Sequence, residues 1–158
     1  MCKGGEHNHM KKKRLFQIAI VVVLLVCIIT FFKPLSFSDI VNEKNQIIMI
    51  LNEFGVKDGE AYIDSDDYQD ITAEQKHSII NVLKKYTYRR TFGTPFSDGS
   101  ISELGDKVLS VYVYDDVSLI WSIIVSSSGK TAINEKTYSM KNAEQLITRL
   151  MKIVENMK

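Results

Sequence analysis

The body of this chain has no cysteine and only one histidine. Cys2 and Cys27 both lie before residue 33, and His77 is the only histidine after residue 9. The body therefore has no disulfide and no thiol nucleophile, and it lacks the side chains for a zinc site or a conventional catalytic triad. About 120 residues can still bury a single hydrophobic core without cross-links.

The body also has no excess of basic residues. Residues 1–14 carry five basic residues and one acidic residue, for a charge of +4, whereas the remainder carries 15 basic and 18 acidic residues, for −3. Nucleic-acid binding requires a basic face that neutralises phosphates, so no nucleic-acid partner is expected.

Two short motifs resemble catalytic loops but lack the required surroundings. The segment "SSSGKT" at 126–131 resembles the end of a nucleotide-binding phosphate loop, but Ile124 stands where the first glycine belongs. Ser127 and Lys130 match the Ser-x-x-Lys of penicillin-binding enzymes, but the motifs that follow it there are missing. Both motifs require a helix, whereas "TAINEKTY" is typical of a strand, so a hairpin turn is the better interpretation.

One long apolar run is present near the N-terminus. Leu15–Phe32 contains only Gln17 and Thr30 as polar residues, and as a helix it would be about 27 Å long, close to the thickness of the hydrocarbon core. Four basic residues at 11–14 precede it. The positive-inside rule then predicts a single-span membrane anchor with its N-terminus in the cytoplasm and the body outside.

Two other fates of the apolar run are open. Small residues at Ser36 and Ser38 would suit cleavage of an export signal before Asp39, although the run is longer than usual for such a signal. Lipid attachment at Cys27 is disfavoured because the run continues beyond it. The expected organisation is a basic tail at 1–14, a transmembrane helix at 15–32, a stalk at 33–45 and an extracytoplasmic domain at 46–158.

The body predicts an α+β fold. Apolar runs and alternation predict an antiparallel sheet of about six strands, and helical spacing predicts two helices packed on one of its faces, in the order ββαββββα. Thr72 with Gln75, and Asn142 with Gln145, fit helix capping. The expected strands are 47–51, 60–64, 86–92, 107–114, 118–127 and 130–138, and the helices begin near 72 and 142.

An internal comparison suggests a duplication. Segments 59–75 and 129–145 align without gaps and share six residues, among them the triplet Ala-Glu-Gln at 73–75 and 143–145. The alignment is explained either by a ββα unit used twice or by turns and caps that reuse the same few residue types.

The candidate binding residues form an acidic patch between residues 58 and 70. The pattern of a calcium-binding loop fails, because Gln69 and Gln75 stand where its glycine and glutamate belong. These acids either favour the positive N-terminus of the following helix or bind a cation or cationic peptide. The exposed faces of "YTYRR" at 86–90 and "VYVYDD" at 111–116 are further candidate surfaces. The patch consists of Asp58, Glu60, Asp64, Asp66, Asp67 and Asp70.

Cofactor chemistry has little support in the sequence, and no cofactor is expected. Cys2, His7 and His9 could bind copper or zinc, but their spacing matches no zinc module, so no metal site is assigned. Because no spacing singles out a pair of carboxylates, an enzyme is not expected.

The chain has a basic tail, an apolar helix and a Lys/Ile/Asn-rich body that ends in "SSGKTAINEKTYSMKN" and a helix. This layout resembles small membrane-anchored extracytoplasmic proteins of low-GC Gram-positive bacteria. The resemblance implies an envelope function or self-protection against bacteriocins, and it transfers no site residue. We therefore expect a non-enzymatic binding module for an envelope protein or a cationic peptide. The alternatives are a single-span regulator of a transporter or kinase, and a hydrolase that uses carboxylates.

Overall fold

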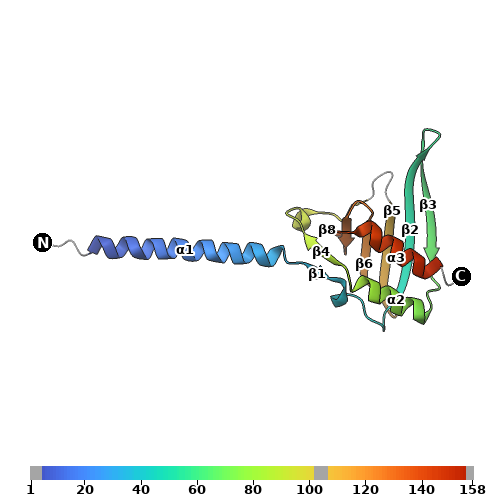
Figure 1. Cartoon of the computed structure of the whole chain (residues 1–158), viewed down its shortest axis with the longest axis horizontal. Helices are drawn as coiled ribbons and strands as arrows, with labels where there is room; N and C mark the ends of the chain where they lie inside the picture. Colours follow the sequence, from blue (N-terminus) through green and yellow to red (C-terminus); the bar gives the residue numbers. More distant parts are fainter. Residues whose placement is uncertain (1–4, 102–106, 156–158) are drawn as a thin grey trace. The chain divides into compact units, whose positions relative to one another are not determined.

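The computed structural model describes residues 5–101 and 107–155, with side chains from Lys13 onward. The chain divides into two compact units, one ending at Lys33 and one beginning at Pro34. The first contains the helix α1 (Gly5–Phe31), and the second contains a sheet and two further helices (Figure 1).

The helix α1 contains the predicted apolar run except for its last residue, Phe32, and it begins ten residues before the run, at Gly5. Its segment Lys13–Phe31 is long and apolar enough to cross a membrane, and its large apolar side chains are exposed. The hydroxyl of Thr30 donates to the carbonyl of Val26 at 2.8 Å, so this polar group is satisfied within the helix. Cys27 is a free thiol on the same helix.

One antiparallel sheet of eight strands forms the centre of the second unit. The strand order is β1-β4-β8-β7-β6-β5-β2-β3. The long hairpin β2–β3 closes at Asp58 and Gly59, whose positive φ angles of 54° and 85° suit a two-residue hairpin loop. The strands are β1 (Leu35–Ser36), β2 (Gln46–Lys57), β3 (Glu60–Tyr68), β4 (Thr87–Arg90), β5 (Lys107–Asp115), β6 (Ser118–Ser126), β7 (Lys130–Ile133) and β8 (Lys136–Met140).

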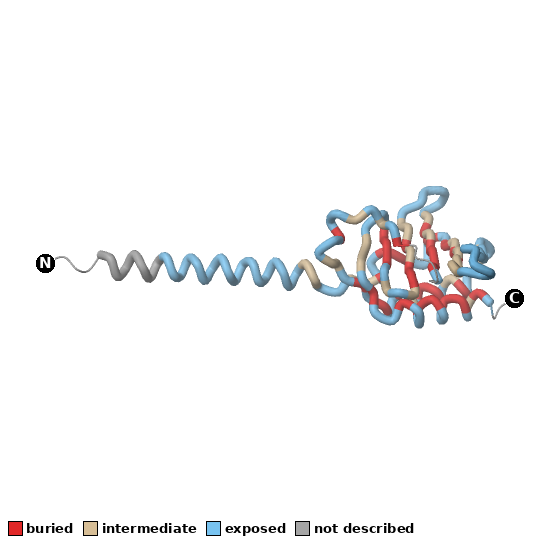
Figure 2. Tube along the Cα trace, turned by 90° about the horizontal axis from the view of Figure 1, so that it is seen from above, coloured by how far each residue is buried: buried red, intermediate tan, exposed pale blue. Residues whose placement is uncertain are grey.

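The helices α2 (Ala73–Leu83) and α3 (Ala143–Glu155) cover one face of this sheet (Figure 1). Each turns its apolar side toward the strands, so the red core in Figure 2 lies between the helices and the sheet. The fully buried side chains of this core come from both layers. They include Met49, Leu109, Val111, Val113, Ile123, Ile79, Ile80, Leu146 and Leu150.

The helix α2 begins at the predicted capping box. The hydroxyl of Thr72 accepts from the backbone N–H of Gln75 at 3.2 Å, and the Gln75 side chain accepts from the backbone N–H of Thr72 at 2.9 Å. The prediction that Asn142 caps α3 in the same way is wrong. Asn142 has a φ of 59°, outside the extended region of a normal cap, and its side chain makes no hydrogen bond with the described helix.

A loop covers part of the second face of the sheet. The short 3-10 helix η2 (Thr94–Phe96) is fixed by Thr94, whose hydroxyl donates to the carbonyl of Thr137 at 2.6 Å. Ile101 then packs in a small cluster with Val108 and Ala132. The loop passes so close to the β7–β8 turn that a Cβ on Gly99 would lie 2.8 Å from the Cα of Glu135.

Two differences account for the eight strands where six were predicted. The expected strand 130–138 is a hairpin, because Asn134 and Glu135 adopt positive φ angles of 45° and 65° and form a turn. The Asn134 side chain fixes that turn by accepting from the backbone N–H of Ser122 at 2.8 Å. The other additional strand is β1.

The segment predicted as a stalk joins the folded unit. After β1, the 3-10 helix η1 (Phe37–Asp39) places the ring of Phe37 in the core, fully buried and 4.9 Å from the ring of Tyr88. Ile40 and Val41 are buried beside it. Residues 37, 40 and 41 have the i, i+3, i+4 spacing of one helical turn, but three residues are too few to predict a buried segment.

The two segments compared above do not fold alike throughout. Both begin in a hairpin turn at a glycine with positive φ and both end in a helix that starts at the shared alanine. Between these points the first segment is the single strand β3, whereas the second is the hairpin β7–β8. The interpretation that one ββα unit is repeated strand for strand is therefore wrong.

Candidate binding surfaces

The predicted acidic patch lies mainly on the edge strand β3. This strand pairs with β2 on one side and is the last in the sheet order, and its residues 60–67 are all exposed. No basic residue occurs between Lys57 and Lys76. The outer edge of β3 is therefore exposed, and the charged side chains along the strand are all negative.

The structure separates the six acids instead of gathering them. Glu60, Asp64 and Asp66 share the side of the strand that faces the helices, because they alternate along β3 and Asp66 lies opposite the buried Leu51. Asp67 points to the other side. Asp58 lies in the hairpin turn, and Asp70 lies in the link before α2. We name Glu60, Asp64, Asp66 and Asp67 the acidic edge.

The carboxylates of the acidic edge have few partners among the described residues. Asp67 accepts from the side-chain amide of Gln69 at 2.6 Å, and none of the four forms an ion pair there. The neighbouring Glu53 on β2 is paired with Lys107. The three remaining carboxylates, which belong to Glu60, Asp64 and Asp66, are solvated and uncompensated.

The pKa of the neighbouring Tyr68 is affected by these negative charges. The pKa of Tyr68 is raised above its ordinary value, first by burial and then by the charges of Asp66 and Glu155. Tyr68 also lines a hollow of about 380 Å³ between the end of β3, the start of α2 and Val154 of α3. The start of α2 and the end of α3 meet here, because the Gln75 side chain donates to the carbonyl of Ile153 at 3.4 Å.

The two candidate aromatic surfaces are less exposed than predicted. In "YTYRR" the rings of Tyr86 and Tyr88 are buried, and Tyr88 packs against Phe37 and Tyr138. The pKa of Tyr88 is raised, first by burial, then by Tyr138 and Asp39, and is lowered in part by Arg90. In "VYVYDD", Tyr112 and Tyr114 are half-buried on the second face of the sheet.

No family model, no curated protein and no solved structure matches this chain.

The two motifs at 126–131 that resemble catalytic loops lie in a hairpin turn and the strand after it. Gly129, with a φ of 93°, is in the turn between β6 and β7, and Lys130 begins β7. A strand therefore follows where both motifs need a helix. His77 is exposed on α2, and its ring lies 2.7 Å from the carboxylate of Glu43.

Metal ligands are not gathered in the described part of the chain. Within residues whose side chains are described, no three His, Cys, Asp or Glu side chains come close enough to hold a metal ion. Of the candidate N-terminal ligands, Cys2 lies outside the described residues, and the side chains of His7 and His9 lie outside the described side chains.

Proposed function

We propose that this protein is a membrane-anchored, extracytoplasmic binding module whose acidic edge pairs with an extended cationic peptide segment. The segment belongs either to an envelope protein or to a free peptide. The observation that carries the proposal is an exposed edge strand with four carboxylates and no basic residue.

The physical basis is addition of a strand to the sheet. An edge strand has a row of backbone N–H and C=O groups on its outer side, and an extended peptide can satisfy them. Side chains of the added strand would alternate between the two sides of the sheet. Basic residues on one side would then lie opposite Asp64 and Asp66, and those on the other side would lie opposite Asp67.

The anchor is proposed to stay attached. The length and composition of α1 support a membrane span. A cut before Asp39 would remove β1 and Phe37 from the domain, and the burial of Phe37 makes this loss costly. Retention predicts that the chain isolated from membranes has its intact mass, and a chain beginning at Asp39 would contradict it.

The test uses the full-length chain in neutral detergent micelles and a labelled peptide of alternating lysine and threonine. Fluorescence anisotropy measures binding to the wild type and to the variant Asp64→Asn/Asp66→Asn/Asp67→Asn. The lysines of this peptide share one side of the added strand and lie opposite Asp64 and Asp66. Each cross-strand charge pair contributes about 0.2–1 kcal/mol, so losing these two pairs should weaken binding about 2-fold to 30-fold. Added salt should weaken wild-type binding, because the carboxylates are exposed.

The matched control is Asp115→Asn/Asp116→Asn, which neutralises a second exposed acidic pair at the β5–β6 turn. It should leave binding unchanged. Edge carboxylates can also act only to prevent two sheets from pairing. In that case the triple variant would self-associate in analytical ultracentrifugation while the wild type failed to bind the peptide, and the proposal would be wrong.

A further inference from the structure

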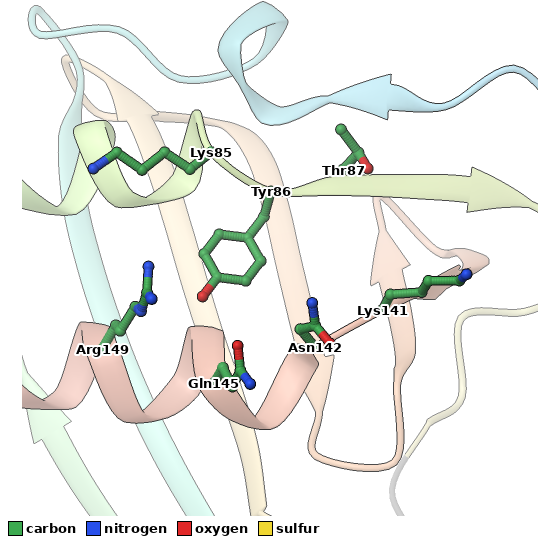
Figure 3. Close-up of a pocket in the computed structure, with 7 residues that line it drawn as sticks. All are labelled: Lys85, Tyr86, Thr87, Lys141, Asn142, Gln145 and Arg149. Atoms are coloured by element: carbon green, nitrogen blue, oxygen red, sulfur yellow. The ribbon is translucent and has the colours of Figure 1, made fainter.

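A groove of about 290 Å³ lies at the opposite end of the helix pair, where α2 ends and α3 begins. Figure 3 shows its lining side chains, which come from the end of α2, the start of β4, the link after β8 and the first turns of α3. None of these residues belongs to the acidic edge.

The groove is lined by three cations and by no carboxylate. Lys85 follows α2, Lys141 precedes α3, and Arg149 projects from α3. None of the three forms an ion pair with a described residue. Three like charges around one hollow repel one another, and a bound anion would relieve that repulsion. We name this site the cationic groove.

The hydroxyl of a largely buried tyrosine reaches the cationic groove. Tyr86 is only 8% exposed, and its hydroxyl lies between Arg149, Gln145 and Asn142 (Figure 3). The guanidinium of Arg149 lies 6.0 Å from the centre of the Tyr86 ring. The hydroxyl makes no hydrogen bond with any described residue, so it can donate to a ligand in the groove.

Further donors surround the same space. The side-chain amides of Asn142 and Gln145 line the groove, and neither makes a hydrogen bond within the described residues. The first turn of α3 begins at Ala143, so the positive end of its dipole is adjacent. The acidic residue of that turn, Glu144, lines the neighbouring hollow with Lys152 and not this groove.

We propose that the cationic groove binds a phosphate group, carried either by a soluble phosphate or by a phospholipid headgroup. The planar guanidinium of Arg149 can donate two parallel hydrogen bonds to phosphate oxygens, while Lys85 and Lys141 supply point charges. Tyr86 and the two amides then donate to the remaining oxygens. Phosphate fits this set better than a carboxylate because it has more acceptor oxygens and can carry a second negative charge.

The experiment titrates inorganic phosphate into the full-length chain in neutral detergent micelles and measures the binding affinity by calorimetry. Arg149→Gln should weaken binding about tenfold, and Lys85→Gln and Lys141→Gln should each weaken it several-fold. These three side chains are exposed, so their replacement leaves the core intact. Tyr86→Phe should weaken binding about threefold or more, because it removes one donor and keeps the ring.

The matched control is Lys84→Gln, which removes an exposed charge next to Lys85 that does not line the groove. It should change the affinity less than twofold. Equal phosphate affinity in Arg149→Gln, Lys85→Gln and the wild type would overturn the proposal. No binding of inorganic phosphate by the wild type would also overturn it, and so would acetate binding as tight as that of phosphate.

A second arm distinguishes the two sources of the phosphate. The micelles are doped with phosphatidate, or with oleate to match the added negative charge, and the phosphate titration is repeated. Loss of inorganic phosphate binding with phosphatidate alone supports a lipid headgroup, and unchanged binding supports a soluble phosphate. The peptide test of the acidic edge uses other residues, so either proposal can fail without the other.

Discussion

Replacing Phe37 with alanine should destabilise the folded unit strongly, although the residue lies only six positions after the apolar helix. The Phe37 side chain is 0% exposed and is part of the main core. Truncation of a buried phenylalanine costs about 3–5 kcal/mol, part of which is the lost ring contact with Tyr88. Since domains of this size are stable by about 5–15 kcal/mol, the loss is a large part of the total.

The assay is chemical denaturation of the full-length chain in detergent micelles, followed by tryptophan fluorescence. Trp121 is the only tryptophan and packs against the core, so its signal reports the sheet unit and not α1. The free energy of unfolding should fall by about 3–5 kcal/mol. In a thermal melt of the same samples, this loss should lower the melting temperature by roughly 10–20 °C for a unit of this length.

The matched control is Phe96→Ala, because Phe96 has the same side chain and is 90% exposed. It should change the free energy of unfolding by less than about 0.5 kcal/mol. If Phe37→Ala and Phe96→Ala gave the same small change, Phe37 would not belong to the core. The argument against cleavage before Asp39 would then lose its basis.

Three further predictions test local features. Thr72→Ala should lower the free energy of unfolding by about 0.5–2 kcal/mol by removing the cap of α2, whereas Thr148→Ala on the exposed side of α3 should change it less, as measured in urea. Gly59→Ala should cost about 1–2 kcal/mol from its positive φ, and Gly99→Ala should cost about 1–3 kcal/mol more because its Cβ would also meet Glu135; equal costs would contradict this contact. Because burial raises the folded pKa of Tyr88, its contribution to stability is complete below about pH 10, where unfolded tyrosine ionises, and is lost as the pH rises through the folded pKa. Tyr88→Phe should therefore reduce the loss of stability above that pH in urea titrations.

Features set by neighbouring residues could be predicted from the sequence. The turn at Asp58-Gly59, the capping box at Thr72 and the apolar side of α3 each depend on residues within a few positions of one another. The α+β class and the helices on one face follow from these local patterns. The same reasoning placed the acids near residues 58–70, but only the strand register shows which of them share a side.

Features that depend on distant contacts could not be predicted. The turn at Asn134-Glu135 lacks the usual glycine, and it is held by Ser122 on another strand. Phe37 is buried by Tyr88, which lies 51 positions later. The cationic groove combines Lys85, Lys141 and Arg149, and no spacing in the sequence connects the first of these with the other two.

The position of β4 in the sheet determines when the N-terminal strand β1 can join it. Its neighbours are β1, a strand of two residues, and β8, the last strand along the chain. During synthesis from the N-terminus, β1 and β4 have no place on the sheet until β8 has been made. Pairings between such distant segments also close large loops and form slowly. The segment that directly follows α1 is therefore the first part of the folded unit to be synthesised, although its place in the sheet exists only after β8.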